Sequence, residues 1–149
     1  MASLNYLTVQ DLLWINLHVT GAPQTFRFDD LEEATFYQYG YGNSQSLLPQ
    51  AARFVSGFLK KQPFAAGNEA SALIACIAFL TVNGAKVSIG DPVAWVEGIK
   101  SGSVEASEAI DRAEVSHHGD GHEPDVRAII TELLASHKDA ISKLTAVPA

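Results

Sequence analysis

The sequence predicts an all-α protein, a helical bundle arranged around one central buried helix at about residues 68–83. Residues 72–80 are apolar on every side, as expected of a helix at the centre of a bundle. An earlier segment repeats apolar residues at helical spacing, and several segments begin with capping residues and end at glycine or proline. Because the 149 residues contain neither an internal repeat nor a linker, we expect a single domain spanning residues 1–149.

The first two helices carry clear start signals. Thr8 is a suitable N-cap, and Asp11, at the third helical position, completes the pattern of a capping box. Gly21 and Pro23 are expected to end this helix. A second helix is predicted from residue 29 or 30 to residue 39, with acidic side chains at the positive end of its dipole.

The third and fourth helices supply the core of the predicted bundle. After a loop at residues 40–46, Pro49 falls early in a third helix whose apolar side chains share one face. That face is formed by Ala51, Phe54, Val55, Phe58 and Leu59. A turn at residues 60–67 then leads into the central helix, at about residues 68–83, and Gly84 ends that helix.

The remainder of the chain is predicted to form shorter elements, each marked by a capping residue, a proline or a polar run. They are an extended piece at residues 85–89, a fifth helix from the Asp91–Pro92 pair to Ile99, a sixth helix capped by Ser103 and ending near Glu114, a polar loop at residues 116–123, and a last helix from Pro124 to Lys143.

Composition excludes several classes of function. The formal net charge of −7 disfavours binding to nucleic acid, whose phosphates repel an acidic protein. Cys76 is the one cysteine, so an intrachain disulfide is excluded and a reducing compartment such as the cytoplasm is expected. We expect neither a signal peptide nor a membrane span, because the longest apolar stretch falls well short of the roughly 20 residues that a span requires.

The segment QPFAAGNEASA, residues 62–72, leads into the central helix and is the candidate functional site. A glycine-containing turn that feeds the start of a helix points free backbone N–H groups outward, and these groups, together with the helix dipole, can bind an anion. Gly67 followed by Asn68 is also a common turn-and-cap pair, so a purely structural role is the alternative.

This segment resembles the signature of the Fic/Doc family, H-x-F-x-D/E-G-N-x-R, in its Doc-like, death-on-curing branch. Phe64, Gly67 and Asn68 match in order and spacing, and Pro63 fits the variable second position. The resemblance extends to residues 71–72 and to flanking segments at residues 7–11 and 79–84, and it covers roughly residues 7–89. It implies the Fic/Doc-type bundle around the central helix, with a short extended flap.

In that family the motif histidine deprotonates a hydroxyl of a target protein, and that hydroxyl attacks a nucleotide phosphate. The acid holds magnesium, the glycine and asparagine line an anion hole, and the arginine grips phosphate. The resemblance therefore implies nucleotidyl or phosphoryl transfer to a protein, commonly by a toxin paired with an antitoxin. Carried over to this chain, it makes Phe64, Gly67, Asn68 and Glu69 candidate contacts for ATP, another nucleotide or phosphate.

The sequence departs from this pattern at the positions that carry the chemistry. Gln62 replaces the histidine, and an amide cannot act as a general base near neutral pH, a loss that costs roughly 10²- to 10⁴-fold in rate. Ala66 replaces the acid, so we do not expect magnesium to bind strongly. Ala70 replaces the arginine, which removes a phosphate clamp, and Glu69 adds a negative charge beside the site. The chain is therefore interpreted as a degenerate member, a pseudoenzyme with no catalytic residue.

A tyrosine-rich segment before the third helix is the candidate surface for a protein partner. The resemblance implies a flap near residues 40–49 that docks a target chain, which makes Tyr39, Tyr41 and Asn43 candidate partner contacts. The alternative is that the tyrosines are packed in or near the core, since aromatic side chains bury large areas in most proteins.

A histidine-rich loop offers weak candidates for metal ligands. His117, His118 and His122, with two nearby acids, could hold zinc or nickel if the loop closed around the ion. Glycines at positions 119 and 121 and a spacing that fits no known site favour the alternative of a solvated loop, so no metal site is predicted.

Three hypotheses for function follow. The favoured one is a catalytically degenerate Fic/Doc-like protein that binds a nucleotide or a protein partner, either a target or an antitoxin, without transfer. The second is an active transferase toxin whose base has moved to Glu69 or to a histidine at residues 117–122. The third is a structural domain that forms a homo-oligomer.

Overall fold

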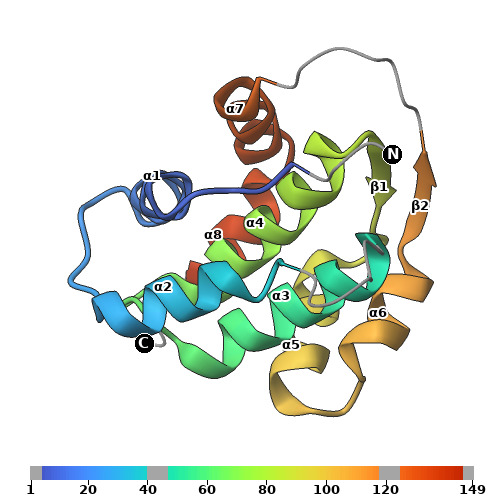
Figure 1. The fold of residues 1–149 in the computed structure, drawn as a ribbon, viewed down its shortest axis with the longest axis horizontal. Helices are drawn as coiled ribbons and strands as arrows, with labels where there is room; N and C mark the ends of the chain where they lie inside the picture. The colour runs from blue at the N-terminus through green and yellow to red at the C-terminus, as the bar shows by residue number, and fades with distance from the viewer. Residues whose placement is uncertain (1–4, 40–46, 118–124, 146–149) are drawn as a thin grey trace.

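The computed structural model describes residues 5–39, 47–117 and 125–145, and for residues 114–117 the backbone alone. Helices account for most of this part of the chain, as predicted. Two short strands form an antiparallel ribbon in addition to the helices (Figure 1). In chain order the elements are α1 (Val9–Thr20), α2 (Phe28–Phe36), α3 (Leu47–Lys61), α4 (Asn68–Val82), β1 (Ala85–Ser88), α5 (Pro92–Ser101), α6 (Ala106–Arg112), β2 (Glu114–His117), α7 (Val126–Ser136) and α8 (Lys138–Thr145).

Helix α4 is the central element, which confirms the prediction for residues 68–83. Of its residues, all except Glu69 and Thr81 are buried, because α1, α3, α5, α7, α8 and β1 pack around it (Figure 1). Burial also raises the pKa of the Cys76 thiol to about 12, so this cysteine stays protonated near neutral pH and is chemically inert.

Helix α1 begins and ends where the sequence predicts. The Thr8 hydroxyl accepts a hydrogen bond from the Asp11 N–H at 3.1 Å, and the Asp11 carboxylate accepts one from the Thr8 N–H at 2.8 Å, which completes the capping box. The same carboxylate pairs with Arg127 of α7 at 3.0 Å, and that guanidinium lies 4.9 Å from the centre of the Trp14 ring. The cap of α1 therefore also attaches α7 to the bundle.

Three predicted boundaries need correction. Helix α2 ends at Phe36, earlier than the predicted residue 39, and α6 spans only Ala106–Arg112, because the Ser103 hydroxyl donates to the Gly98 carbonyl instead of capping α6. The predicted last helix is two helices that meet at His137. The Nδ1 atom of His137 lies 3.0 Å from the Leu133 carbonyl oxygen, so the ring occupies an acceptor at the end of α7.

The two strands form a ribbon at the carboxyl end of α4. The predicted extended piece at residues 85–89 is confirmed as β1, and β2 pairs with it antiparallel, with Val87 opposite Val115. The prediction of a polar loop is therefore wrong for residues 116–117, while residues 118–123 lie outside the described part. Val87 and Val115 are 28 positions apart in the sequence, and pairing between such distant residues is not revealed by local polarity.

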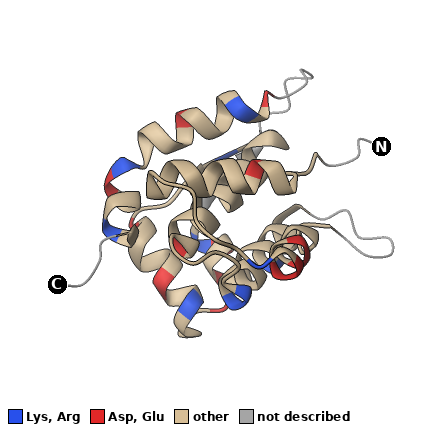
Figure 2. Ribbon diagram, turned by 90° about the vertical axis from the view of Figure 1, so that its left-hand side faces the viewer, with Lys and Arg blue, Asp and Glu red and all other residues tan. Residues whose placement is uncertain are grey.

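Apart from Asp11, which is buried, the charged residues of the described helices are at least partly exposed. Figure 2 shows basic and acidic positions interspersed along the same helices, and several of them pair, as Lys61 does with Glu33 at 2.8 Å. The hydrogen bond from Lys61 holds the pKa of Glu33 below its ordinary value. Within the described residues, every helix is too short or too polar to cross a membrane.

Gly57 sets the distance between α2 and α3, and its replacement is expected to destabilise the fold. A Cβ atom at this position would lie 2.3 Å from the Tyr37 ring. We expect Gly57→Ala to lower the free energy of unfolding by roughly 1–3 kcal/mol in urea denaturation, because overpacking outweighs the gain in helix propensity. Gly90→Ala is the control, since a Cβ there meets nothing within 4 Å. Equal stability of the two variants would show that the Tyr37 ring moves aside freely.

Candidate functional site

The candidate site is the turn between α3 and α4, and it begins at Gln62, the position where the signature that the segment resembles has histidine. Gln62 adopts a left-handed backbone conformation, with φ of 47°, at the end of α3. Its N–H donates to the Phe58 carbonyl at 3.0 Å, and its side-chain amide donates to the Leu59 carbonyl at 2.9 Å. The Gln62 amide thus satisfies carbonyl groups at the end of its own helix.

Asn68 and Phe64 hold the turn closed. The Asn68 side chain accepts a hydrogen bond from the Phe64 N–H at 3.0 Å and donates one to the Phe64 carbonyl at 2.7 Å. Both residues are buried, and the Phe64 ring packs against Phe58 of α3. These two motif residues therefore fix the geometry of the turn, and the Asn68 amide is committed to that role.

Gly67 is required by both conformation and space. Its φ of 79° is left-handed, and a Cβ atom here would lie only 2.4 Å from the Thr20 methyl carbon of α1. Next to it, the Asn16 side chain donates to the Ala66 carbonyl at 2.9 Å and to the Ser71 hydroxyl at 3.1 Å. Helix α1 therefore supports the turn directly. Asn16 was missed as a site residue, although a polar side chain on the apolar face of a helix was the available signal.

The other motif positions differ in their surroundings. Ala66 is exposed, whereas Ala70 is fully buried within the core. The Glu69 carboxylate pairs with the amino group of Lys100, which projects from α5. Lys100 therefore brings a cation to the first turn of α4 from a distant part of the chain, which the motif itself does not indicate.

An extended segment between α1 and α2 lies against the turn. Phe26 and Phe64 form an antiparallel bridge, in which the Arg27 N–H donates to the Pro63 carbonyl and the Ala65 N–H to the Thr25 carbonyl, both at 2.9 Å. This segment was missed in the sequence, where the flap was expected near residues 40–49.

The Arg27 side chain fastens this segment to the end of α3. Its guanidinium donates to the carbonyl oxygens of Lys61 and Gln62 at 2.8 and 2.6 Å, where the negative end of the helix dipole favours a cation. It also contacts Asp30 at 2.5 Å, and this hydrogen bond lowers the pKa of the Asp30 carboxyl. Arg27 thus links the extended segment, α2 and the end of α3.

An apolar hollow of about 210 Å³ opens beside this segment. Two of its residues, Leu17 and Phe26, remain 37% and 41% exposed although both are large and apolar. The hollow is lined by Leu13, Asn16, Leu17, Pro23, Gln24, Phe26 and Phe64. Its mainly hydrocarbon lining favours an apolar group over a phosphate.

The remaining predicted site residues lie elsewhere. The Tyr39 ring packs at a tilt against the Tyr6 ring, with ring centres 4.1 Å apart, while Tyr41 and Asn43 fall outside the described residues. His117 lies in β2, opposite Ala85 and therefore at the far end of α4 from the motif. His118 and His122 are outside the described part, within which His, Cys, Asp and Glu nowhere gather in threes as a metal site requires.

No protein-family model, no curated protein and no solved structure matches this chain. The relationship to the Fic/Doc family therefore depends on the motif and flanking residues, and it stays a prediction.

Removal of the Asn68 side chain tests its role in closing the turn. We expect Asn68→Ala to lower the free energy of unfolding by roughly 2–4 kcal/mol, because two buried backbone groups of Phe64 lose their partner and each costs about 1–3 kcal/mol. Gln24→Ala removes an amide whose hydrogen bond is local and exposed, and is expected to be near neutral. A similar small effect of both substitutions in urea denaturation would contradict the proposed role of Asn68 in closing the turn.

Proposed function

We propose that this chain is a catalytically degenerate Fic/Doc-like protein that binds an extended segment of a protein partner beside its motif, without group transfer. The observation that carries this proposal is the Phe26–Phe64 bridge with the apolar hollow next to it. The scaffold of the motif is intact in Phe64, Gly67 and Asn68, whereas the chemical groups expected on it are missing.

The bridge leaves one edge of the extended segment open to a partner. Phe26 faces Phe64 as the non-hydrogen-bonded pair, since the bonds on either side come from Arg27 and Thr25. In an antiparallel pair, the N–H and C=O groups of such a residue point away from the neighbouring strand. A partner segment can add there as a further strand, the mode by which many proteins recognise extended peptides.

The hollow supplies the specificity that backbone hydrogen bonds lack. At about 210 Å³ it has room for one large apolar side chain, which would contact Leu13, Leu17 and Phe64. A partner segment with an apolar residue next to the added strand would fill the hollow and cover Leu17 and Phe26. Burial of that apolar surface favours association.

Loss of catalysis follows from the three replaced positions. Gln62 offers no titratable nitrogen, and its amide bonds to Leu59 of its own helix. Ala66 and Ala70 offer no ligand for magnesium or phosphate. A base at Glu69 would have to leave Lys100, and a base at His117 would act from the opposite end of α4, about 22 Å away for a helix of 15 residues.

Nucleotide or phosphate binding is the second candidate, and the position of Lys100 favours it. The first N–H groups of α4 have no acceptor within the helix, and the Lys100 amino group lies at Glu69 beside them. A phosphate there would have to separate Lys100 from Glu69 or tolerate the carboxylate, so we expect weaker binding than in family members that carry the arginine.

Restoring the histidine alone is not expected to restore transfer. We predict that Gln62→His, incubated with radiolabelled ATP, magnesium and cell extract, labels no protein above the wild-type background. The physical reason is that the metal ligand and the phosphate clamp are also missing at Ala66 and Ala70. Gln62→His combined with Ala66→Asp serves as the comparison, because Ala66 is exposed, whereas an arginine at the buried position 70 would disrupt the core. Strong labelling by the single variant, or by the wild type, would contradict the proposal of a degenerate site.

Site-directed photo-crosslinking tests the partner surface. With benzoylphenylalanine in place of Phe26, we expect one discrete adduct in extract, and in place of Glu132 of α7 none, because only the former lies at the open edge. Leu17→Asp should reduce the adduct at position 26 by at least about tenfold, since a charge in the hollow opposes apolar burial. Equal adducts at both positions, or an adduct unaffected by Leu17→Asp, would refute binding at this edge.

A further inference from the structure

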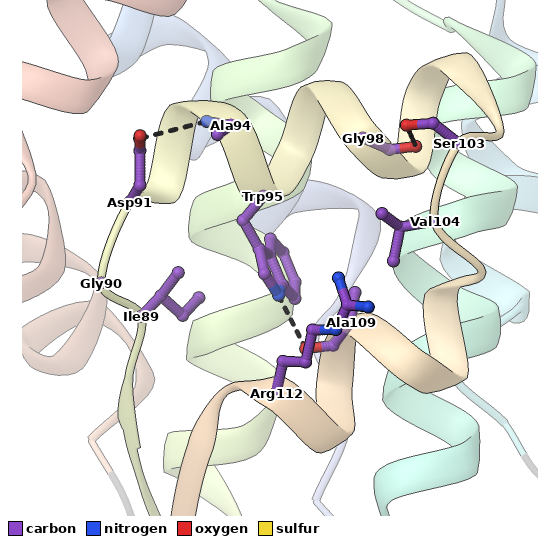
Figure 3. A pocket seen from close by; sticks show the side chains of 10 residues that line it. All are labelled: Ile89, Gly90, Asp91, Ala94, Trp95, Gly98, Ser103, Val104, Ala109 and Arg112. Atoms are coloured by element: carbon purple, nitrogen blue, oxygen red, sulfur yellow. Dashed lines mark hydrogen bonds between the residues drawn. The ribbon is translucent and has the colours of Figure 1, made fainter.

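A second pocket, of about 400 Å³, lies between α5, α6 and the turn that follows β1 (Figure 3). Its volume is typical of a site for a small organic molecule. The pocket is lined mainly by apolar groups, among them Ile89, Trp95 and Val104, and it has one cation, Arg112.

This pocket is separate from the motif. Its lining residues include Asp91, the N-cap of α5, and Ala94, Trp95 and Gly98 of that helix, which share one face at helical spacing. Lys100, which reaches the motif through Glu69, lies on roughly the opposite face of α5, because successive residues turn by about 100°. A ligand in this pocket would therefore not compete with a partner bound beside Phe64.

The wall of the pocket is held in place before any ligand binds. The Trp95 indole N–H donates to the Ala109 carbonyl at 2.8 Å, which ties the ring on α5 to α6 (Figure 3). The hydrogen-bonding group of the indole is thus satisfied, and the part of the ring that lines the pocket can stack on a ligand. A fixed ring loses little conformational freedom on binding.

Arg112 is available to pair with an anion. Its guanidinium side chain is 63% exposed and lies 3.8 Å from the Glu108 carboxylate, a distance beyond a hydrogen bond. Exposed pairs of this kind contribute little to stability, so Arg112 can leave Glu108 and bind a ligand with little loss of free energy. Figure 3 shows Asp91, which caps α5 through the Ala94 N–H, at the other end of the pocket from Arg112. The Asp91 carboxylate disfavours an anion at its own end.

We propose that this pocket binds a small aromatic carboxylate, with its ring against Trp95 and Val104 and its carboxylate on Arg112. The two ends of the pocket favour this orientation, because the Arg112 guanidinium lies at one end and the Asp91 carboxylate at the other. A planar guanidinium is suited to a carboxylate, which it can hold through two parallel hydrogen bonds. The proposal is independent of the function proposed for the motif.

Calorimetric titration with 2-naphthoate tests this site. We expect saturable one-to-one binding that weakens roughly tenfold or more in Arg112→Gln, because the charge-assisted hydrogen bonds are lost. Arg112→Lys should retain part of the affinity, and Ala94→Phe should abolish binding by filling the pocket. Lys138→Gln removes an equal charge from α8 and is the matched control, expected within about twofold of the wild type.

The neutral analogue 2-naphthylmethanol separates this site from general apolar adsorption. It is expected to bind at least about tenfold more weakly than 2-naphthoate to the wild type and equally weakly to Arg112→Gln. Circular dichroism confirms that each variant is folded. Absence of saturable binding of 2-naphthoate, equal affinity for both compounds, or an equal loss in Lys138→Gln would overturn the proposal.

Discussion

The burial of α4 on all sides is the constraint on which the rest of the structure depends. A helix with apolar groups around its whole circumference reaches low free energy only when other elements cover every face. Helices α1, α3 and α7 provide most of that cover, and α5, α8 and β1 complete it. Because both ends of α4 are thereby fixed, the turn that precedes it is fixed as well. The packing of the core therefore determines the positions of the motif residues.

The turn is held by groups other than the base, the metal ligand and the phosphate clamp that the resemblance leads us to expect. Asn68 closes it through the backbone of Phe64, Asn16 supports it from α1, and Arg27 ties the neighbouring segment to the end of α3. None of these contacts requires a histidine at position 62, an acid at 66 or an arginine at 70. The contacts that hold the turn therefore do not depend on the side chains at positions 62, 66 and 70 having catalytic groups.

Sequence patterns predicted those features that depend on local interactions. The capping box of Thr8 and Asp11 and the all-apolar helix around Cys76 each depend on residues a few positions apart, and both are confirmed. The pairing of β2 with β1, the bridge from Phe26 to Phe64, and the approach of Lys100 to Glu69 join residues far apart in the chain. Such contacts depend on how the helices pack, so the motif could be located from the sequence but its neighbours could not.

Two large apolar side chains remain exposed around the hollow beside the motif. Single exposed apolar residues are ordinary in proteins, but a group of them around a hollow marks a surface that is covered during function. Among the described residues, Leu17 and Phe26 are two of the four large apolar side chains that remain exposed, and both line the hollow beside the motif. Folding does not account for this arrangement, because α1 already buries Leu12 and Ile15 on its core face. A partner that covers Leu17 and Phe26 would account for it, because the hollow and the turn held by Asn68 share Phe64.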